Sequence, residues 1–306
     1  MSEQIKALPV QEDTGANLKS LSWRDYLELT KPRVVALMIL TSVIGMLLAV
    51  PGVPGWQVLL FGNLGIALLA GAAAVVNHVV DQKIDTVMAR TRKRPVATGR
   101  IAPLDAMLFA TVLAAAGMAI LIWQVNELTA WLTLASLVGY AGVYTLFLKR
   151  ATPQNIVIGG LAGAMPPLLG WTAVTGQVDG HALLLVLIIF AWTPPHFWAL
   201  AIHRKEEYAK AGIPMLPVTH GNKYTELHIL LYTLMLLAVS LLPFVTGMSG
   251  GIYLVGALAL GLRFLQYSVR LLKGDDRRVA LDTFKYSITY LMALFVVLLV
   301  DHFVFF

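Results

Sequence analysis

The sequence contains no cysteine and carries few charges for its length. The absence of cysteine excludes disulfide bonds, thiolate catalysis and iron–sulfur clusters. Charged residues make up 13% of the 306 residues and hydrophobic residues 58%, whereas about a quarter of a soluble protein's residues are charged. We therefore expect an all-α polytopic membrane protein that forms one helical domain.

The amino-terminal segment, residues 1–33, lacks the short apolar core of a signal peptide. Its acidic residues, among them Glu3, Glu12 and Asp13, argue against a mitochondrial presequence. We expect residues 1–33 to form a cytoplasmic tail, residues 34–306 to form a single transmembrane domain, and a bacterial plasma (inner) membrane to hold the protein.

Hydrophobic runs long enough to cross a bilayer occur at about nine places, by the criterion of roughly 20 apolar residues. The expected spans are 34–50, 57–80, 104–124, 128–147, 155–175, 181–202, 227–247, 251–271 and 284–304. The region from 226 to 273 allows another division around Gly247, Gly250 and Gly251.

Lysine and arginine residues lie on one side of this arrangement only. They occupy the amino-terminal tail and the second, fourth, sixth and eighth connections, and the other connections contain neither residue type. The positive-inside rule then places the amino terminus in the cytoplasm and the carboxy terminus outside. The net charge of +6 reflects this asymmetry and contact with anionic lipids rather than nucleic-acid binding.

Three oxygen-bearing side chains, Asn77, Asp81 and Asp85, follow one another at intervals of four residues near the end of the second span. This spacing keeps them on nearly one face of a helix. Carboxylates beside such an apolar run are costly, although they could also cap a helix or pair with Lys83 and Arg90. Hard oxygen ligands followed by Arg90 and Arg94 suit magnesium holding a phosphate ester.

Two later cytoplasmic connections add further charged candidates. The fourth contains Lys149 and Arg150, which could equally be topology signals, and the sixth contains Arg204, Glu206 and Glu207. The two glutamates could also be ordinary solvated loop residues. If both acidic segments bind metal, two magnesium ions could hold one diphosphate while basic residues neutralise the leaving group.

Several motifs closely resemble the UbiA-type intramembrane prenyltransferases, in particular the branch that farnesylates haem. The resemblance covers nearly all of the chain after the tail. The motifs are Asn77-x3-Asp81-x3-Asp85 with Met88-x-Arg90-Thr91-x2-Arg94-Pro95, Lys149-Arg150-x-Thr152-Pro153-Gln154-Asn155, Pro166-Pro167-x2-Gly170-Trp171, Trp192-Thr193-Pro194-Pro195-His196-Phe197-Trp198 and Ala211-Gly212-Ile213-Pro214-Met215-Leu216-Pro217.

The resemblance implies nine helices around a cavity open to the cytoplasmic side, with Mg²⁺ as cofactor and farnesyl diphosphate and haem B as substrates. Farnesyl transfer to a haem vinyl group, followed by water addition, would give haem O and diphosphate. A haem A synthase or a terminal-oxidase assembly factor is the implied partner. The implied site residues are Asn77, Asp81 and Asp85 as metal ligands, Arg90, Arg94, Lys149 and Arg150 as diphosphate contacts, and Glu206 and Glu207 in place of the family's second aspartate-rich motif.

Aromatic residues and one histidine complete the expected substrate site. Tyr144, Trp192 and Trp198 could face an allylic cation, or could simply pack in the core or at the interface. His196 follows Pro194 and Pro195, which remove backbone donors and are expected to kink the helix. It could ligate haem iron, hold a propionate, or satisfy a freed carbonyl. His78 points about 100° away from Asn77 and is expected to be a cavity residue rather than a metal ligand.

Two other functions remain open from the sequence. A prenyltransferase could use a small aromatic acceptor, such as a quinone precursor, in place of haem. A transporter could use intramembrane Asn and Asp as an ion site beside a proline-broken helix. The position of the acidic segments at the cytoplasmic ends, next to arginines, favours a diphosphate over an ion at the membrane midplane.

Overall fold

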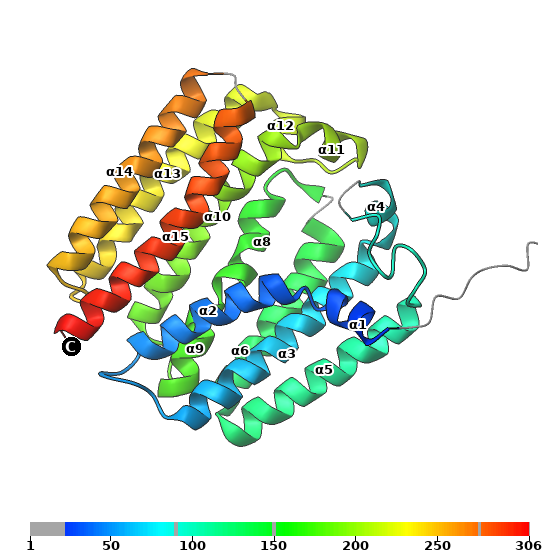
Figure 1. Ribbon diagram of the computed structural model, residues 1–306, viewed down its shortest axis with the longest axis horizontal. Helices are drawn as coiled ribbons and strands as arrows, with labels where there is room; N and C mark the ends of the chain where they lie inside the picture. The colour runs from blue at the N-terminus through cyan, green and yellow to red at the C-terminus, as the bar shows by residue number, and fades with distance from the viewer. Residues whose placement is uncertain (1–21, 89–90, 149–150, 275–276, 306) are drawn as a thin grey trace, which may run out of the picture.

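The computed structural model describes residues 22–88, 91–148, 151–274 and 277–305, and every regular element in these ranges is a helix (Figure 1). The helices are α1 Trp23–Leu29, α2 Pro32–Leu48, α3 Trp56–Val80, α4 Gln82–Val87, α5 Pro103–Gln124, α6 Glu127–Val138, the π-helix η1 Gly139–Leu148, α8 Asn155–Ala164, α9 Pro166–Thr175, α10 Gly180–His203, α11 Lys205–Lys210, α12 Leu216–Thr219, α13 Gly221–Val245, α14 Gly251–Lys273 and α15 Arg277–Phe305. The predicted all-α class is confirmed.

The membrane spans match the prediction with one change in form. Within the described residues, eight spans are long and apolar enough to cross a bilayer as they stand. The ninth is a bent pair, α1 and α2, whose axes differ by 52°. Two of the eight are composite: Glu127–Thr145 joins α6 to η1, and Asn155–Thr175 joins α8 to α9. The ambiguous region near Gly247 divides between α13 and α14.

The helices form a closed ring. Neighbours along the chain pack against each other, including α2 with α3, α3 with α5, α8 with η1 and α10, and α13 with α14. The last helix, α15, contacts both α10 and α2, which brings the two ends of the chain's helical part together. Figure 1 shows α2 between α15 on one side and α3 on the other. This closure leaves α2, α3, η1, α8 and α10 around a common interior.

Close packing of α2 against α9 depends on the glycine of the Pro166-Pro167-x2-Gly170 motif. A Cβ atom at Gly170 would lie 2.0 Å from the backbone oxygen of Ser42 on α2. Only glycine therefore allows these two backbones to meet, which is the usual role of small residues between membrane helices. This contact holds α2 against α9 in the ring.

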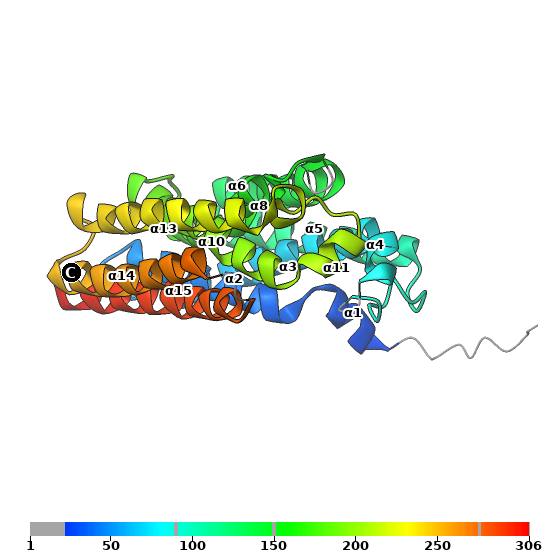
Figure 2. The same ribbon diagram turned by 90° about the horizontal axis from the view of Figure 1, so that it is seen from above.

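Polar connections gather at one end of the bundle. The short helices α4 and α11 lie side by side at this end in both views, and the carboxy terminus lies at the opposite end (Figures 1 and 2). Met88, which follows α4, shares a hydrophobic cluster with Tyr208 of α11 and with Ile213 and Met215. The second and sixth connections are therefore packed together, and their shared end is called the α4–α11 end.

Candidate active site

A cavity of about 580 Å³ occupies the interior of the ring. Its lining comes from α2, α3, α4, α6, η1, α8 and α10, with contributions from α9, α11 and α15. Charged groups lie near the α4–α11 end, and apolar side chains line the deeper part. Ile66, a deep lining residue, precedes Asn77 by 11 residues, which is about 16 Å along a helix axis. The cavity is thus a long apolar chamber with a polar end.

The polar wall is built from Asn77, Asp81 and Asp85. Helix α3 ends at Val80 and α4 begins at Gln82, but the helical hydrogen bonds continue across Asp81. Asp81 N donates to Asn77 O over 3.0 Å, and Asp85 N donates to Asp81 O over 2.8 Å. The three residues therefore keep helical spacing, and all of them line the cavity. They are 4%, 2% and 3% exposed, respectively.

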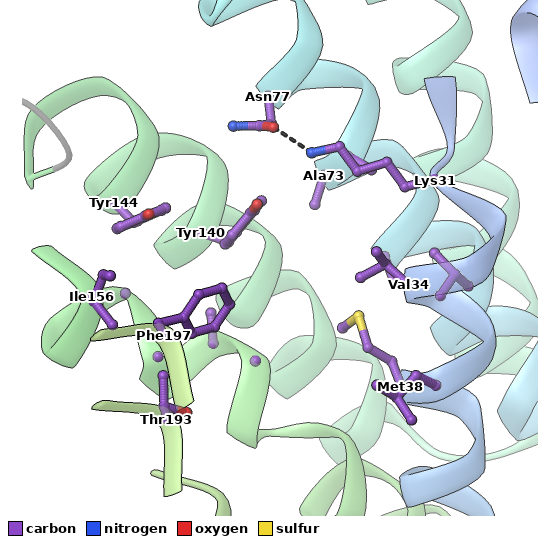
Figure 3. A pocket seen from close by; sticks show the side chains of 18 of the residues that line it. Lys31, Val34, Met38, Ala73, Asn77, Tyr140, Tyr144, Ile156, Thr193 and Phe197 are labelled. Atoms are coloured by element: carbon purple, nitrogen blue, oxygen red, sulfur yellow. Dashed lines mark hydrogen bonds between the residues drawn. The ribbon is translucent and has the colours of Figure 1, made fainter. Parts of the chain in front are cut away.

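Two cations face this wall. Lys31, in the turn between α1 and α2, donates from Nζ to Asn77 Oδ1 (Figure 3). Asn77 Nδ2 in turn donates to Asp81 Oδ2 over 2.8 Å. On the other side, Arg94 Nη1 donates to both carboxylate oxygens of Asp85, over 2.9 and 2.7 Å. Charge-assisted contacts of this kind neutralise buried carboxylates that would otherwise be costly.

The same oxygen atoms suit a divalent metal. Magnesium prefers hard oxygen ligands, commonly one or two carboxylates together with substrate phosphates. Asn77, Asp81 and Asp85 supply an amide oxygen and two carboxylates on one wall of the cavity. In the described part of the chain, no group of three or more His, Cys, Asp or Glu side chains converges as a metal site. The donor set therefore fits a metal that is shared with a phosphate ligand rather than one enclosed by protein.

Two tyrosines of η1 line the opposite wall. Tyr140 and Tyr144 stack with ring centroids 5.5 Å apart, and Figure 3 shows both across the cavity from Lys31 and Asn77. Tyr144 rests against α8 at Gly159, where a Cβ atom would lie 2.2 Å from the Tyr144 ring. The absence of a side chain at Gly159 therefore determines where the Tyr144 ring lies. A π-helical turn is frequently associated with functional sites.

His196 lines the cavity from α10, and its position is fixed by α15. Its Nδ1 atom lies 2.6 Å from Ser287 Oγ, and Trp192 Nε1 donates to Ser287 O over 2.7 Å. The imidazole ring is stacked between Trp192, at a centroid distance of 4.1 Å, and Phe284, at 4.6 Å. His196 Nδ1 therefore bonds a serine hydroxyl rather than a carbonyl freed by the prolines. Helix α10 continues through Pro194 and Pro195 without ending.

Other predicted residues lie away from the cavity lining. Trp198 is fully buried and packs edge-on against Tyr232 of α13, with centroids 5.3 Å apart. Arg204 caps α10 and does not line the cavity. Glu206 is exposed and Glu207 half-buried, and neither is a lining residue, although the next residue, Tyr208, is. The Glu207 Oε2 atom is buried without a hydrogen-bond partner among the described residues.

Three predicted diphosphate contacts, Arg90, Lys149 and Arg150, lie outside the described residues. Conversely, neither Lys31 nor Tyr140 was predicted from the sequence to be a site residue. Lys31 was predicted only to lie in the cytoplasmic tail and to contribute to membrane orientation. The signal for Tyr140 was available, because it precedes Tyr144 by four residues and so shares its helical face. No local pattern indicates the contact between Lys31 and Asn77, which are 46 residues apart.

Sequence comparisons place the chain among known proteins. The profile of the UbiA prenyltransferase family matches residues 38–298. The chain is 92% identical to a protoheme IX farnesyltransferase of Marinobacter nauticus over 301 residues, covering 98% of this chain and 99% of the relative. It is 68% identical to a protoheme IX farnesyltransferase of Hahella chejuensis, covering 96% of this chain and 98% of the relative.

Solved structures share the fold at low sequence identity. A structure described for digeranylgeranylglyceryl phosphate synthase superposes with a TM-score of 0.79 at 19% identity, covering 92% of this chain and 98% of that one. A UbiA homologue from Archaeoglobus fulgidus, bound to GPP and Mg²⁺, gives a TM-score of 0.61 at 16% identity, covering 90% of this chain and 99% of that one. Because the family profile spans most of the sequence and the relatives match along nearly their full length, the chain belongs to the UbiA prenyltransferase family and is a multi-pass membrane prenyltransferase.

Proposed function

We propose that this protein transfers a farnesyl group from farnesyl diphosphate to a vinyl group of haem B and that water then adds, giving haem O and diphosphate. The observation that most supports this proposal is the polar wall at the end of a long apolar cavity. The wall is formed by Asn77, Asp81 and Asp85, and Lys31 and Arg94 lie beside it. The names of relatives at 92% and 68% identity support haem as the acceptor.

The polar wall holds and activates the diphosphate. Asn77, Asp81 and Asp85 would bind magnesium, which withdraws charge from the diphosphate as a Lewis acid. Lys31 and Arg94 lie within reach of the same end of the cavity and neutralise the charge that develops on the leaving group. We include Arg90, Lys149 and Arg150 as further contacts from their sequence motifs.

The second acidic segment has one residue suited to a metal. Glu207 Oε2 is buried and has no hydrogen-bond partner among the described residues, and a bound cation would offset the cost of burying this carboxylate oxygen. Glu207 also lies next to Tyr208, which lines the cavity. We therefore propose Glu207, rather than the exposed Glu206, as the ligand of a second magnesium ion.

The apolar part of the cavity would keep water from C1 of the farnesyl group until C1 has bonded to the vinyl group. The C1–O bond of farnesyl diphosphate breaks, and its electron pair leaves with diphosphate. The electron pair of the haem vinyl group then forms a bond to C1. Water adds to the carbon made cationic beside the porphyrin ring and loses a proton to solvent. Tyr140, Tyr144 and Trp192 line the cavity, and their aromatic rings would stabilise the allylic cation.

We propose that His196 holds haem. The Ser287 hydroxyl donates its hydrogen to Phe284 O over 2.6 Å. Because that hydrogen is already used, Ser287 Oγ must accept the hydrogen bond from His196 Nδ1–H. In that tautomer His196 Nε2 carries a lone pair, which can ligate haem iron. The ring is held from both faces by Trp192 and Phe284, so its orientation is set before a ligand binds.

A reconstitution experiment tests the proposed reaction. Purified protein is incubated with haem B and farnesyl diphosphate, with and without Mg²⁺, and the extracted haem is analysed by mass spectrometry. We expect a magnesium-dependent product that has gained one farnesyl group and one water. Farnesylation of a quinone precursor in place of haem, or flux across proteoliposomes without product, would instead support one of the other two functions.

We further propose that the protein lies in a bacterial inner membrane with its amino terminus and α4–α11 end in the cytoplasm, because the basic connections lie at that end. The cysteine-free chain allows a direct test. Cysteine introduced as Lys93→Cys should be protected from an impermeant maleimide in intact cells, whereas Gln177→Cys should be labelled. We also propose a haem A synthase or a terminal-oxidase assembly factor as the partner, which co-purification would detect.

A further inference from the structure

A second cavity lies beside the first and shares lining residues with it. It is lined by four cationic residues, by one carboxylate and by a histidine of α3: Arg24, Lys31, Arg33, Arg94, Glu28 and His78. Lys31, Arg33 and Arg94 also line the first cavity. The two cavities therefore share a wall made of cationic side chains.

The turn between α1 and α2 builds one side of this second cavity. Lys31 has φ 51° and ψ 59°, and it is the only non-glycine residue with positive φ in the described part of the chain. A lysine rarely adopts this left-handed conformation, and such outliers concentrate at functional sites. Pro32 then starts α2 with a φ value suited to a helix. The bend places Arg24 on α1 and Arg33 on α2 around the same space.

His78 is the independent sign that this space takes a ligand. His78 is only 2% exposed, yet neither Nδ1 nor Nε2 of its ring has a hydrogen-bond partner among the described residues. Buried ring nitrogens are ordinarily paired, because an unpaired polar atom out of water is unfavourable. His78 lines the second cavity and not the first. A ligand atom in the second cavity would supply the missing partner.

The charges specify an anion. Glu28 is half exposed and lies 3.9 Å from Arg100, so it does little to offset the cations. Arg33 forms no ion pair with any other described residue. Arg94 uses only Nη1 on Asp85, and its planar guanidinium keeps further N–H donors for a second oxyanion. A phosphate group can accept two hydrogen bonds from an arginine guanidinium and pair with a lysine ammonium, so it matches this combination of cations.

We infer that the second cavity is a separate phosphate-binding site, used by diphosphate as it leaves the first cavity. This inference rests on the proposed function, since the first cavity must release diphosphate after each turnover. Lys31 and Arg94 contact both spaces, so the anion can pass from one to the other without losing its cationic partners. The shared chemistry is a phosphate oxyanion, which the headgroup of an anionic lipid could also provide.

Calorimetry on protein whose first cavity is already filled tests the inference. The protein is saturated with farnesyl thiodiphosphate, a slowly reacting analogue, and Mg²⁺, and is then titrated with inorganic diphosphate in nanodiscs of phosphatidylcholine. A second set of nanodiscs contains phosphatidylglycerol. Arg33→Gln and His78→Leu each remove one lining group. Arg92→Gln is the matched control, because Arg92 is exposed and lines neither cavity.

We expect wild-type protein loaded with the analogue to bind diphosphate, and each lining variant to bind it about tenfold more weakly. Arg92→Gln should stay within about twofold of wild type. Weaker diphosphate binding in phosphatidylglycerol would support the site and assign its phosphate to lipid; equal binding would assign it to diphosphate. Absence of binding, or equal binding by all variants, would overturn the inference. Failure of the analogue itself to bind would count against the proposed function instead.

Discussion

The two acidic segments of the chain meet at the same end of the bundle but differ in what surrounds them. In the first, Asn77, Asp81 and Asp85 are almost fully buried, line the cavity and contact Lys31 or Arg94 or each other. In the second, Glu206 is exposed, whereas Glu207 is half-buried and its Oε2 atom has no hydrogen-bond partner in the part of the chain that the structure describes. The two segments therefore carry similar charges but differ in burial and in their contact with the cavity, and this difference is the basis on which we propose metal ligands.

The largest effect is expected in the first segment. Asp81→Asn and Asp85→Asn keep the side-chain volume, but each removes a carboxylate from the wall proposed to bind the metal. Because stabilisation of developing charge is lost, kcat should fall by about 10²- to 10³-fold. Steady-state assays of haem O formation at saturating Mg²⁺ measure this. Near-normal kcat in both variants would show that the buried wall is not the metal site.

The neighbouring glutamates of the second segment give a sharper comparison. Glu207→Gln should lower kcat/KM for farnesyl diphosphate by about tenfold or more, because it removes a charge beside the cavity. Glu206→Gln should change it by less than about twofold, since its side chain is exposed. The same assay over a range of Mg²⁺ concentrations separates them. If Glu206→Gln had the larger effect, burial would be the wrong criterion for choosing the metal ligand between these two glutamates.

The wall opposite the acidic residues can be disturbed through a single methyl group. Gly159→Ala would push a Cβ atom into the Tyr144 ring, and such overpacking costs about 1–3 kcal/mol. We expect a lower Tm and a roughly fivefold fall in kcat. The control is Gly139→Ala, where a Cβ atom meets nothing within 4 Å. A Gly159→Ala protein with unchanged Tm and activity would show that the position of Tyr144 does not matter.

The last comparison concerns Ser287, which we expect to act on haem binding through His196. Ser287→Ala removes the partner of His196 Nδ1, a loss of about 1 kcal/mol that corresponds to roughly a fivefold change in binding. Haem affinity, followed by absorbance, should weaken, while KM for farnesyl diphosphate stays the same. Ser268→Ala is the matched control, because this buried serine bonds Thr233 away from the cavity. An equal loss of haem affinity in the control would indicate a general packing effect.

Much of the fold was predictable because each membrane span is a continuous apolar run. The division between α13 and α14 falls at the glycines that the sequence singled out, since glycine favours the positive φ found at Gly247. Asn77, Asp81 and Asp85 were also predicted to share a face, because helical geometry is local. These features depend only on residues that are close together in the sequence.

Features that depend on angle or distant contact were missed or misplaced. Trp198 belongs to the same motif as His196 but lies two positions later, about 200° around the helix, and so packs against α13 rather than the cavity. Trp192 precedes His196 by four residues and shares its face. Lys31 reaches Asn77 only because α2 packs against α3. No pattern within the first 33 residues contains that information.

Locating the metal tests the central claim most directly. Crystals of the protein with Mn²⁺ in place of Mg²⁺ and with farnesyl thiodiphosphate would show the metal by anomalous scattering. We predict a peak within about 2.5 Å of oxygen atoms of Asp81 and Asp85, with the diphosphate between this metal and Lys31. A peak elsewhere, with the diphosphate distant from this wall, would contradict the account.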